Sequence, residues 1–238
     1  ISRERAGGGL NFDYKPDDDT SLYLRTLYSR FEDNETRNST AFEFSDPQAE
    51  DEVGKTKTKR KLKQREETQE IQSYVFGGER TMGLWTLSGQ AGYSESSEDN
   101  PGGIAGATFK GSSSIGDGGF YDTEKPRPII GAGFYDPNNF SLDKVDWQEQ
   151  HTKDIEKNIR LDLARDYDVQ GYASQVKFGG KVSRRNKDND LNAWTYKDFS
   201  DLGFSDEQLS LNAFNKGNRH YNLGQYGPGI SGGAIKDL

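Results

Sequence analysis

Alternation of apolar and polar residues in one segment constrains the fold of this chain more than any other sequence feature. Val176, Phe178 and Val182 are apolar, and Lys177 and Lys181 lie between them. In a β-strand this period of two places the apolar side chains on one face and the lysines on the other. A soluble β-sandwich and a membrane β-barrel both contain such strands, because one face is dry or lipid-exposed and the other is wet. The function therefore depends on which solvent the apolar face meets.

The composition excludes two classes of protein. Only 31% of the residues are hydrophobic and the mean hydropathy is -0.99, which excludes a helical membrane protein. No stretch approaches the roughly 18 consecutive apolar residues that a spanning helix needs. Aromatic residues make up 12% of the chain, too many for a disordered acidic tail. This composition, rich in glycine as well, is typical of an outer-membrane barrel and equally compatible with a secreted β-protein.

Charge and cysteine content narrow the partners. The net charge of -8 argues against nucleic acid as a partner. The absence of cysteine excludes disulfides and thiolate chemistry. The chain opens on Ile1 without an initiating methionine or an apolar signal segment, so we expect it to be an internal part of a longer protein.

The alternation predicts three hairpins. They lie near 8–31, 69–95 and 158–185, with turns at 16–20, 82–84 and 166–173. In the third hairpin we expect Ile159–Leu163 to pair with the strand that carries the lysines. Each arm has about 9–11 residues, the length that a tilted strand needs to cross a bilayer.

The segments between the hairpins are long and polar. They cover 32–68, 96–157 and 186–238, and they alternate strictly with the short turns. Outer-membrane barrels have short periplasmic turns and long outer loops, whereas structureless loops of this length are rare in compact soluble domains. The predicted fold is therefore all-β: an antiparallel meander of about six strands that forms an incomplete arc of a transmembrane β-barrel.

Candidate ligand-binding residues lie in the predicted loops and at the rim. They are Arg184, Arg185, Trp194, Tyr196, Trp147 and Tyr135. The aromatic rings are suited to stacking on sugars or aromatic chelators, although they also suit packing of the large loops against one another. The two arginines follow the last strand and suit an anionic ligand, or else salt bridges at the rim.

The sequence offers no catalytic or metal-binding pattern. It has no GxSxG motif, no cysteine nucleophile and no Ser-His-Asp set, so we expect no enzyme and no cofactor. His151 and His220 are far apart and lack ligand spacing, which argues against a metal site. The basic run Lys55–Lys63 is flanked by acidic residues, so we expect a solvated loop or a strand extension there, with lipopolysaccharide phosphates as an alternative contact and nucleic acid disfavoured.

Several phrases of the sequence resemble the barrel of TonB-dependent outer-membrane receptors. They are LNFDYKPDDDTSLYLRTLYSRFEDNE at 10–35, SYVFGGERTMGLWTLSGQAGYSESSED at 73–99 and KFGGKVSRRNKDND at 177–190. DPNNFSLDKVD at 136–146 is similar to the segment that precedes a strand in the large-loop subgroup common in Caulobacter- and Xanthomonas-type bacteria.

This resemblance implies a location and a set of partners. It implies a receptor in the outer membrane of a Gram-negative bacterium, in contact with lipid and lipopolysaccharide. Such a receptor takes up a small nutrient, such as a ferric siderophore or an oligosaccharide, by TonB-dependent active transport. A plug and a TonB box are absent from these residues, and a full barrel of this type has about 22 strands. The TonB complex would therefore be contacted through parts outside this chain.

Two other functions are compatible with the same sequence patterns. One is a passive outer-membrane porin, and the other is a soluble carbohydrate-binding β-sandwich of a secreted protein. The sandwich requires the apolar faces of 10–14, 159–163 and 176–182 to meet in one dry core. The barrel requires them to form one continuous lipid-facing band. Its opposite, concave side would carry Asp13, Arg160, Asp162, Lys177 and Lys181.

Overall fold

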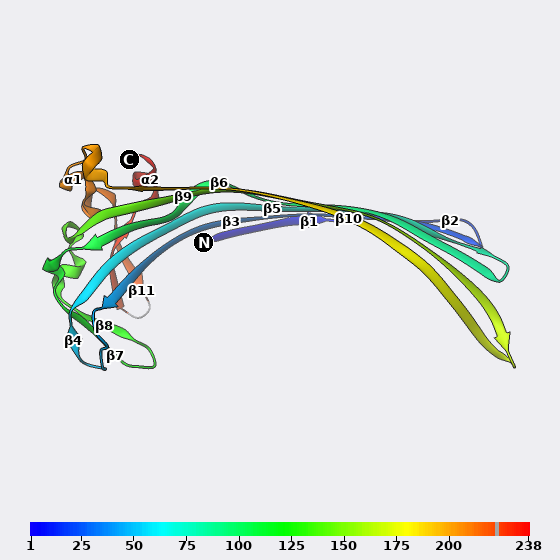
Figure 1. The fold of residues 1–238 in the computed structure, drawn as a ribbon, viewed down its shortest axis with the longest axis horizontal. Helices are drawn as coiled ribbons and strands as arrows, with labels where there is room; N and C mark the ends of the chain where they lie inside the picture. Colours follow the sequence, from blue (N-terminus) through cyan, green and yellow to red (C-terminus); the bar gives the residue numbers. More distant parts are fainter. Residues whose placement is uncertain (222–223) are drawn as a thin grey trace.

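The computed structural model describes residues 1–221 and 224–238, most of which form one long antiparallel sheet (Figure 1). The strands of this sheet are β1 (Ser2–Gly8), β2 (Asn11–Asp17), β3 (Thr20–Phe44), β5 (Thr56–Met82), β6 (Trp85–Gly111), β9 (Phe140–Val169) and β10 (Tyr172–Lys197). Their order is β1-β3-β5-β6-β9-β10, and β2 pairs with β3 further along the edge that β1 occupies. The predicted all-β antiparallel meander is confirmed, and the sheet is open, with β1 and β2 at one edge and β10 at the other.

The strands are much longer than the sequence pattern predicted. β3 has 25 residues and β9 has 30, so the segments 32–68 and 96–157 are largely strand and about half of 186–238 is strand. The prediction of these segments as loops is therefore wrong over most of their length. In these stretches polar residues occupy both faces, which removes the apolar alternation by which strands are recognised. Cross-strand ion pairs occur there instead, such as Lys59 Nζ with Glu43 Oε1 at 2.7 Å and Lys153 Nζ with Glu95 Oε1 at 2.8 Å.

Two-residue turns join the hairpins at one end of the sheet. Gly83 and Leu84 connect β5 to β6, so the turn predicted at 82–84 is one residue shorter, because Met82 still pairs with Trp85. The third turn consists of Gln170 and Gly171 alone, not of 166–173, because the strands continue to Val169 and from Tyr172. Gln170 and Gly171 both have positive φ, at 55° and 88°, which is the pattern of a type I′ turn and matches the twist of the flanking strands.

The first turn is also shorter than predicted. It contains Asp18 and Asp19, whereas the sequence predicted a turn over 16–20. Pro16 lies inside β2, at a register shift between Tyr14 and Asp17 on the outer strand of the sheet. An edge strand tolerates proline because the missing N–H points away from the ladder.

The opposite end of the sheet carries a small folded unit, the apical lobe, formed by 112–139, 198–221 and 224–238 together with 45–55 (Figure 1). Its strands are β4 (Val53–Gly54), β7 (Gly118–Tyr121), β8 (Arg127–Ile130), β11 (Asn215–Tyr221) and β12 (Gly224–Ile230). Its helices are η1 (Ser113–Ile115), η2 (Ala132–Tyr135), η3 (Pro137–Asn139), η4 (Phe199–Leu202), α1 (Asp206–Leu209), η5 (Leu211–Phe214) and α2 (Gly232–Lys236). Within the described residues, no helix has the length and apolar character needed to cross a membrane.

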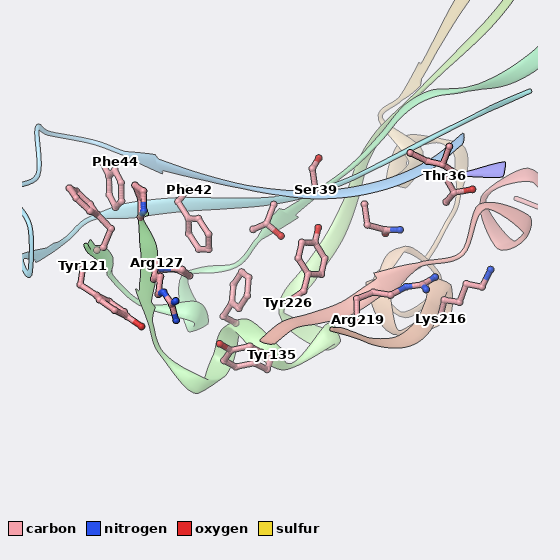
Figure 2. Close-up of a pocket in the computed structure, with 18 residues that line it drawn as sticks. Thr36, Ser39, Phe42, Phe44, Tyr121, Arg127, Tyr135, Lys216, Arg219 and Tyr226 are labelled. Carbon is pink, nitrogen blue, oxygen red and sulfur yellow. The ribbon is translucent and has the colours of Figure 1, made fainter. Parts of the chain in front are cut away.

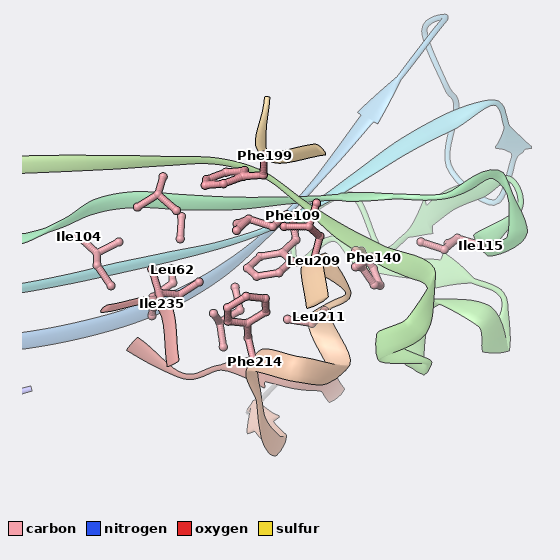
Figure 3. Close-up of a cluster of buried hydrophobic side chains, with 14 of the residues drawn as sticks. Leu62, Ile104, Phe109, Ile115, Phe140, Phe199, Leu209, Leu211, Phe214 and Ile235 are labelled. Carbon is pink, nitrogen blue, oxygen red and sulfur yellow. The ribbon is translucent and has the colours of Figure 1, made fainter. Parts of the chain in front are cut away.

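The buried hydrophobic cluster lies between the apical lobe and the sheet (Figure 3). Leu62, Ile104 and Phe109 come from the sheet and are fully buried. Phe214 of η5 packs on Phe109 with ring centroids 5.4 Å apart. Leu211 is also fully buried. The dry core of this chain therefore holds the lobe to the ends of the strands.

β6 contains two bulges where the lobe begins. Its register with β9 shifts between Asn100 and Gly103 and again between Ile104 and Gly106. Gly102 has φ 133°, and a Cβ on it would approach the Trp147 ring at 3.0 Å. Glycine is therefore needed at Gly102, and extra residues of this kind bend and twist a strand. The bulges explain why a Pro-Gly-Gly sequence lies inside a strand.

Candidate functional site

The residues that the strand register aligns across the sheet form apolar rows. One row is Phe12, Leu24, Phe76, Ala91, Ile159 and Val182. The next row toward the turns is Tyr14, Leu22, Gly78, Gly89, Leu161 and Gly180. Together with Leu87, Leu163, Val176 and Phe178 on the same face, we call these rows the apolar band. The predicted continuous band is therefore present.

The apolar band is exposed. The exposed fraction is 58% for Phe12, 59% for Ile159 and 75% for Val182. One face of the sheet carries the apolar side chains of 10–14, 159–163 and 176–182. Among the described residues, these side chains do not meet in a dry core. The arrangement that a soluble β-sandwich requires is thus not formed.

The opposite face of the same strands is polar. Its central row is Asp13, Tyr23, Gly77, Gln90, Arg160 and Lys181. Arg160 Nε donates to Asp162 Oδ2 at 2.7 Å, and Tyr23 donates its hydroxyl proton to Gln90 Oε1 at 3.3 Å. The five charged residues predicted for one face lie on the face opposite Val176 and Phe178, as the register with β9 requires.

Aromatic side chains mark both limits of the apolar band. At the turn end, the Arg165 guanidinium lies over the Trp85 ring, 5.1 Å from its centroid. At the lobe end, Tyr74 and Tyr93 lie side by side with ring centroids 6.4 Å apart. Trp85 and Tyr93 are on the same strand and the same face, and the eight steps between them span about 26 Å.

A large cleft opens in the apical lobe, between the free edge of β3 and the lobe segments that carry β7, β8, η2 and β11 (Figure 2). Its volume is about 1170 Å³. Rings from different segments line it: Phe42, Phe44, Phe120, Tyr121, Phe134, Tyr135 and Tyr226. We call it the apical cleft. Its volume is somewhat above the usual range of about 300–1,000 Å³ for small-molecule sites, and its aromatic lining is typical of such sites.

The charged side chains that line the apical cleft are all basic. They are Arg127, Lys216 and Arg219. None of the three forms a salt bridge within 4.0 Å among the described residues. The Arg219 Nε is buried and has no hydrogen-bond partner in the described part of the chain. The cleft therefore combines ring faces with uncompensated positive charge, which suits a ligand that carries both a ring and a negative charge.

Arg60 fixes the base of the apical cleft. This fully buried side chain donates to the carbonyl oxygens of Tyr226 at 2.9 Å, Phe134 at 3.0 Å and Pro228 at 3.3 Å. Its guanidinium also lies 4.2 Å from the Phe134 ring centroid. No carboxylate accompanies it among the described residues, and burial lowers the pKa of Arg60 to about 10. Burial likewise raises the pKa of Tyr226.

Backbone geometry at Gly227 permits this arrangement. Gly227 has φ 84°, and a Cβ there would lie 2.6 Å from Arg60 Nη2. Glycine is the residue that adopts this conformation and leaves the space. The segment that carries Tyr226 is thereby held against β5.

The six predicted site residues do not form one site. Only Tyr135 lines the apical cleft. Trp147 and Trp194 are partners across β9 and β10, next to the pair Tyr196 and Val145. The Lys236 ammonium lies over the Trp147 ring at 5.8 Å.

The two arginines have different surroundings. Arg185 Nε donates to Asp154 Oδ1 at 2.9 Å, so the salt bridge is the arrangement that it adopts. Arg184 lies on the other face, beside the apolar band.

The run Lys55–Lys63 is mostly strand, with Thr58, Arg60 and Leu62 buried between outward lysines. The His220 side chain lies outside the described residues, and no group of three or more metal-ligating side chains occurs in the described part.

Sequence reasoning missed most of the apical cleft. Phe42 and Phe44 alternate with polar neighbours, a strand signal that was available but weak. No sequence signal marks Arg127 or Arg219, because the fold alone brings them to one cavity.

No protein-family model matches this sequence, and no curated protein matches it either.

Proposed function

We propose that this chain forms part of the wall of an outer-membrane β-barrel receptor, with the apical lobe outside the cell. The receptor takes up a small nutrient by TonB-dependent active transport. The observation that carries the proposal is the apolar band. It runs across β2, β3, β5, β6, β9 and β10, and the opposite face of the same strands is polar.

The dimensions of the band support a bilayer as its solvent. The lipid-facing band of outer-membrane barrels is about 25 Å tall and is bordered by aromatic girdles. Trp85 and Tyr93 limit a stretch of about 26 Å measured along a strand, which tilt shortens by a few ångströms. Exposed apolar surface of this extent is rare on soluble monomers. In lipid it is stable once further strands close the barrel, because closure satisfies the backbone groups of both open edges.

The two ends of the sheet support the orientation. Two-residue turns at one end correspond to the periplasmic side of such barrels, and elaborate connections lie on the outer side. The apical cleft is then a place where the nutrient binds outside the membrane, on the continuation of the lipid-facing side of β3, and the nutrient would have to pass from there to the lumen side. Its rings and its three basic side chains favour a ring-bearing anion, such as a siderophore or an acidic oligosaccharide. A shaped cleft of this kind favours a receptor over a passive pore.

The absence of cysteine makes the lipid contact directly testable. Single cysteines are introduced at Val176, Phe178 or Val182 and at Lys177 or Lys181 of the full-length gene product, labelled with an environment-sensitive fluorophore and reconstituted in bilayers. We expect blue-shifted emission and quenching by nitroxide lipids at the first three positions only. Equal quenching at all five positions contradicts the proposal.

Uptake requires a separate measurement. Cells that produce the wild type or the double variant Arg127→Gln/Arg219→Gln are compared for growth on iron chelates and oligosaccharides, with and without TonB. We expect one nutrient to support growth only with TonB and the wild-type cleft. Growth that is independent of TonB would indicate a porin.

A further inference from the structure

A second hollow lies at the lobe-side limit of the apolar band. Its volume is about 480 Å³, and it spans β3, β5, β6, β9 and β10. Ala91, Ile159 and Val182 line it, and Tyr93 borders it on the side of the lobe. Three of these four residues belong to the apolar band, so the hollow is a groove in the face that the proposed function assigns to lipid.

Two basic residues stand at the lobe-side end of this groove. Lys157 and Arg184 are direct cross-strand partners, and each is two residues beyond a member of the apolar band on its own strand. The Lys157 ammonium lies 5.9 Å from the centroid of the Tyr93 ring. Both basic side chains are exposed.

Neither basic residue has a counterion. Among the described residues, no carboxylate lies within 4.0 Å of Lys157 or Arg184, whereas their neighbours Lys153 and Arg185 are both paired. Glu95, the nearest acidic residue along β6 on this face, accepts from Lys153 at 2.8 Å. Like charges that face each other across two strands are unfavourable unless an anion lies between them.

We propose that a phosphate-bearing lipid of the lobe-side leaflet binds in this groove. Its phosphate contacts Lys157 and Arg184, and its acyl chain lies along Ala91, Ile159 and Val182. The inference rests on the proposed function, since it requires the apolar band to face lipid. In the outer leaflet of a Gram-negative outer membrane, this lipid is the phosphorylated lipid A of lipopolysaccharide.

The test uses the full-length gene product and purified lipid A. Lipid A binding in nonionic detergent is measured by native mass spectrometry for the wild type and for Lys157→Gln/Arg184→Gln. The matched control is Lys177→Gln/Lys181→Gln, which removes the same charge from the opposite face of the same sheet. We expect about tenfold weaker binding for the first variant and wild-type binding for the control.

Two further arms identify which part of the lipid is bound. Ala91→Phe fills the groove but keeps both charges, and we expect it to weaken lipid A binding as well. Lipid A without phosphates is expected to bind the wild type as weakly as intact lipid A binds Lys157→Gln/Arg184→Gln. Free inorganic phosphate should not displace lipid A. Equal binding by the wild type and the charge variant, or equal loss in the control, overturns the proposal.

The fluorescence scan of β10 separates this proposal from the proposed function. If the emission alternates along β10 but the charge variant binds lipid A normally, only the lipid site is wrong. If the alternation is absent, the proposed function and the lipid site are both overturned. Heat-modifiable migration in gels confirms that each variant has folded.

Discussion

Arg60 shows how one side chain determines the form of the apical cleft. A buried guanidinium without a carboxylate loses hydration, and the lowered pKa of Arg60 reflects this cost. Three carbonyl oxygens and the surrounding rings compensate for part of that loss. Because the carbonyls belong to η2 and β12, the contacts connect two lobe segments to β5.

Replacing Arg60 with alanine is expected to destabilise the apical lobe by about 3 kcal/mol, because it leaves buried carbonyls unpaired and vacates a large volume. The control is Lys59→Ala, which removes a part-exposed ion pair with Glu43 and is expected to cost less than about 1 kcal/mol. Hydrogen exchange at 226–230 reports the local free energy of opening. Equal exchange rates in the two variants would contradict the role of Arg60.

The pH dependence of the Arg60→Ala effect follows from the direction in which folding shifts the pKa of Arg60. Because burial lowers the pKa of Arg60 to about 10 on folding, the unfolded state binds more protons only between this pH and the higher pKa of the unfolded chain. The cost of burying the charge is therefore present in full at lower pH and is relieved only above about pH 10. The difference in opening free energy between wild type and Arg60→Ala should be constant from about pH 6 to 9.

At the scale of elements, two-residue turns set the register of the β5–β6 and β9–β10 hairpins, whose arms all run for more than 25 residues. A shift of one residue would exchange the two faces of a strand and place lysines in the apolar band. In the β9–β10 hairpin, positive φ at Gln170 and Gly171 selects the one turn type that fits the strand twist.

Gln170→Asn is expected to stabilise this hairpin by about 0.5 kcal/mol, because asparagine adopts positive φ more readily than glutamine. Gly171→Ala is the opposing variant and is expected to destabilise it by about 1 kcal/mol. Urea unfolding midpoints of the reconstituted protein measure both changes. A destabilised Gln170→Asn variant would show that the turn does not govern the hairpin.

How well the sequence predicts these strands depends on whether their two faces differ in polarity. Near the turns, Val176, Phe178 and Val182 alternate with lysines, and the side chains that share each face could be predicted. Toward the lobe, strands such as Thr56–Met82 carry polar residues on both sides, and the pattern has no period to detect. The apical cleft could be predicted only at Tyr135, since its other residues come from segments up to 225 positions apart, from Ile1 to Tyr226.

At the scale of the molecule, one set of strands meets two environments. The turn-side part has an exposed apolar face, and the lobe-side part buries the same face of β5, at Leu62, under the lobe. The β3–β5 pairing runs from Thr20 to Phe44 without a register shift, so residues two apart stay on one side throughout. The lobe therefore covers the continuation of the apolar band.

A charge in the middle of the apolar band distinguishes lipid from water. Leu161→Arg is expected to cost about 2–4 kcal/mol of folding free energy in a bilayer, since arginine near the midplane of a barrel is destabilising by that amount. Gln90→Arg on the opposite face is the control and is expected to be nearly neutral. Folding into lipid vesicles, followed by heat-modifiable migration, measures both variants. If Leu161→Arg folds as well as the control, lipid does not contact this face.

The distance between the apolar band and the lobe has a consequence for where a ligand of the apical cleft would be held. From Tyr93 to Phe109 the strand β6 continues for about 50 Å beyond the band. In the proposed orientation, strands that tilt by about 35–45° would place the apical cleft about 35–40 Å above the apolar band. A ligand held there would lie clear of the acyl chains and the headgroups. Its binding is therefore expected to be independent of the lipid composition of the bilayer.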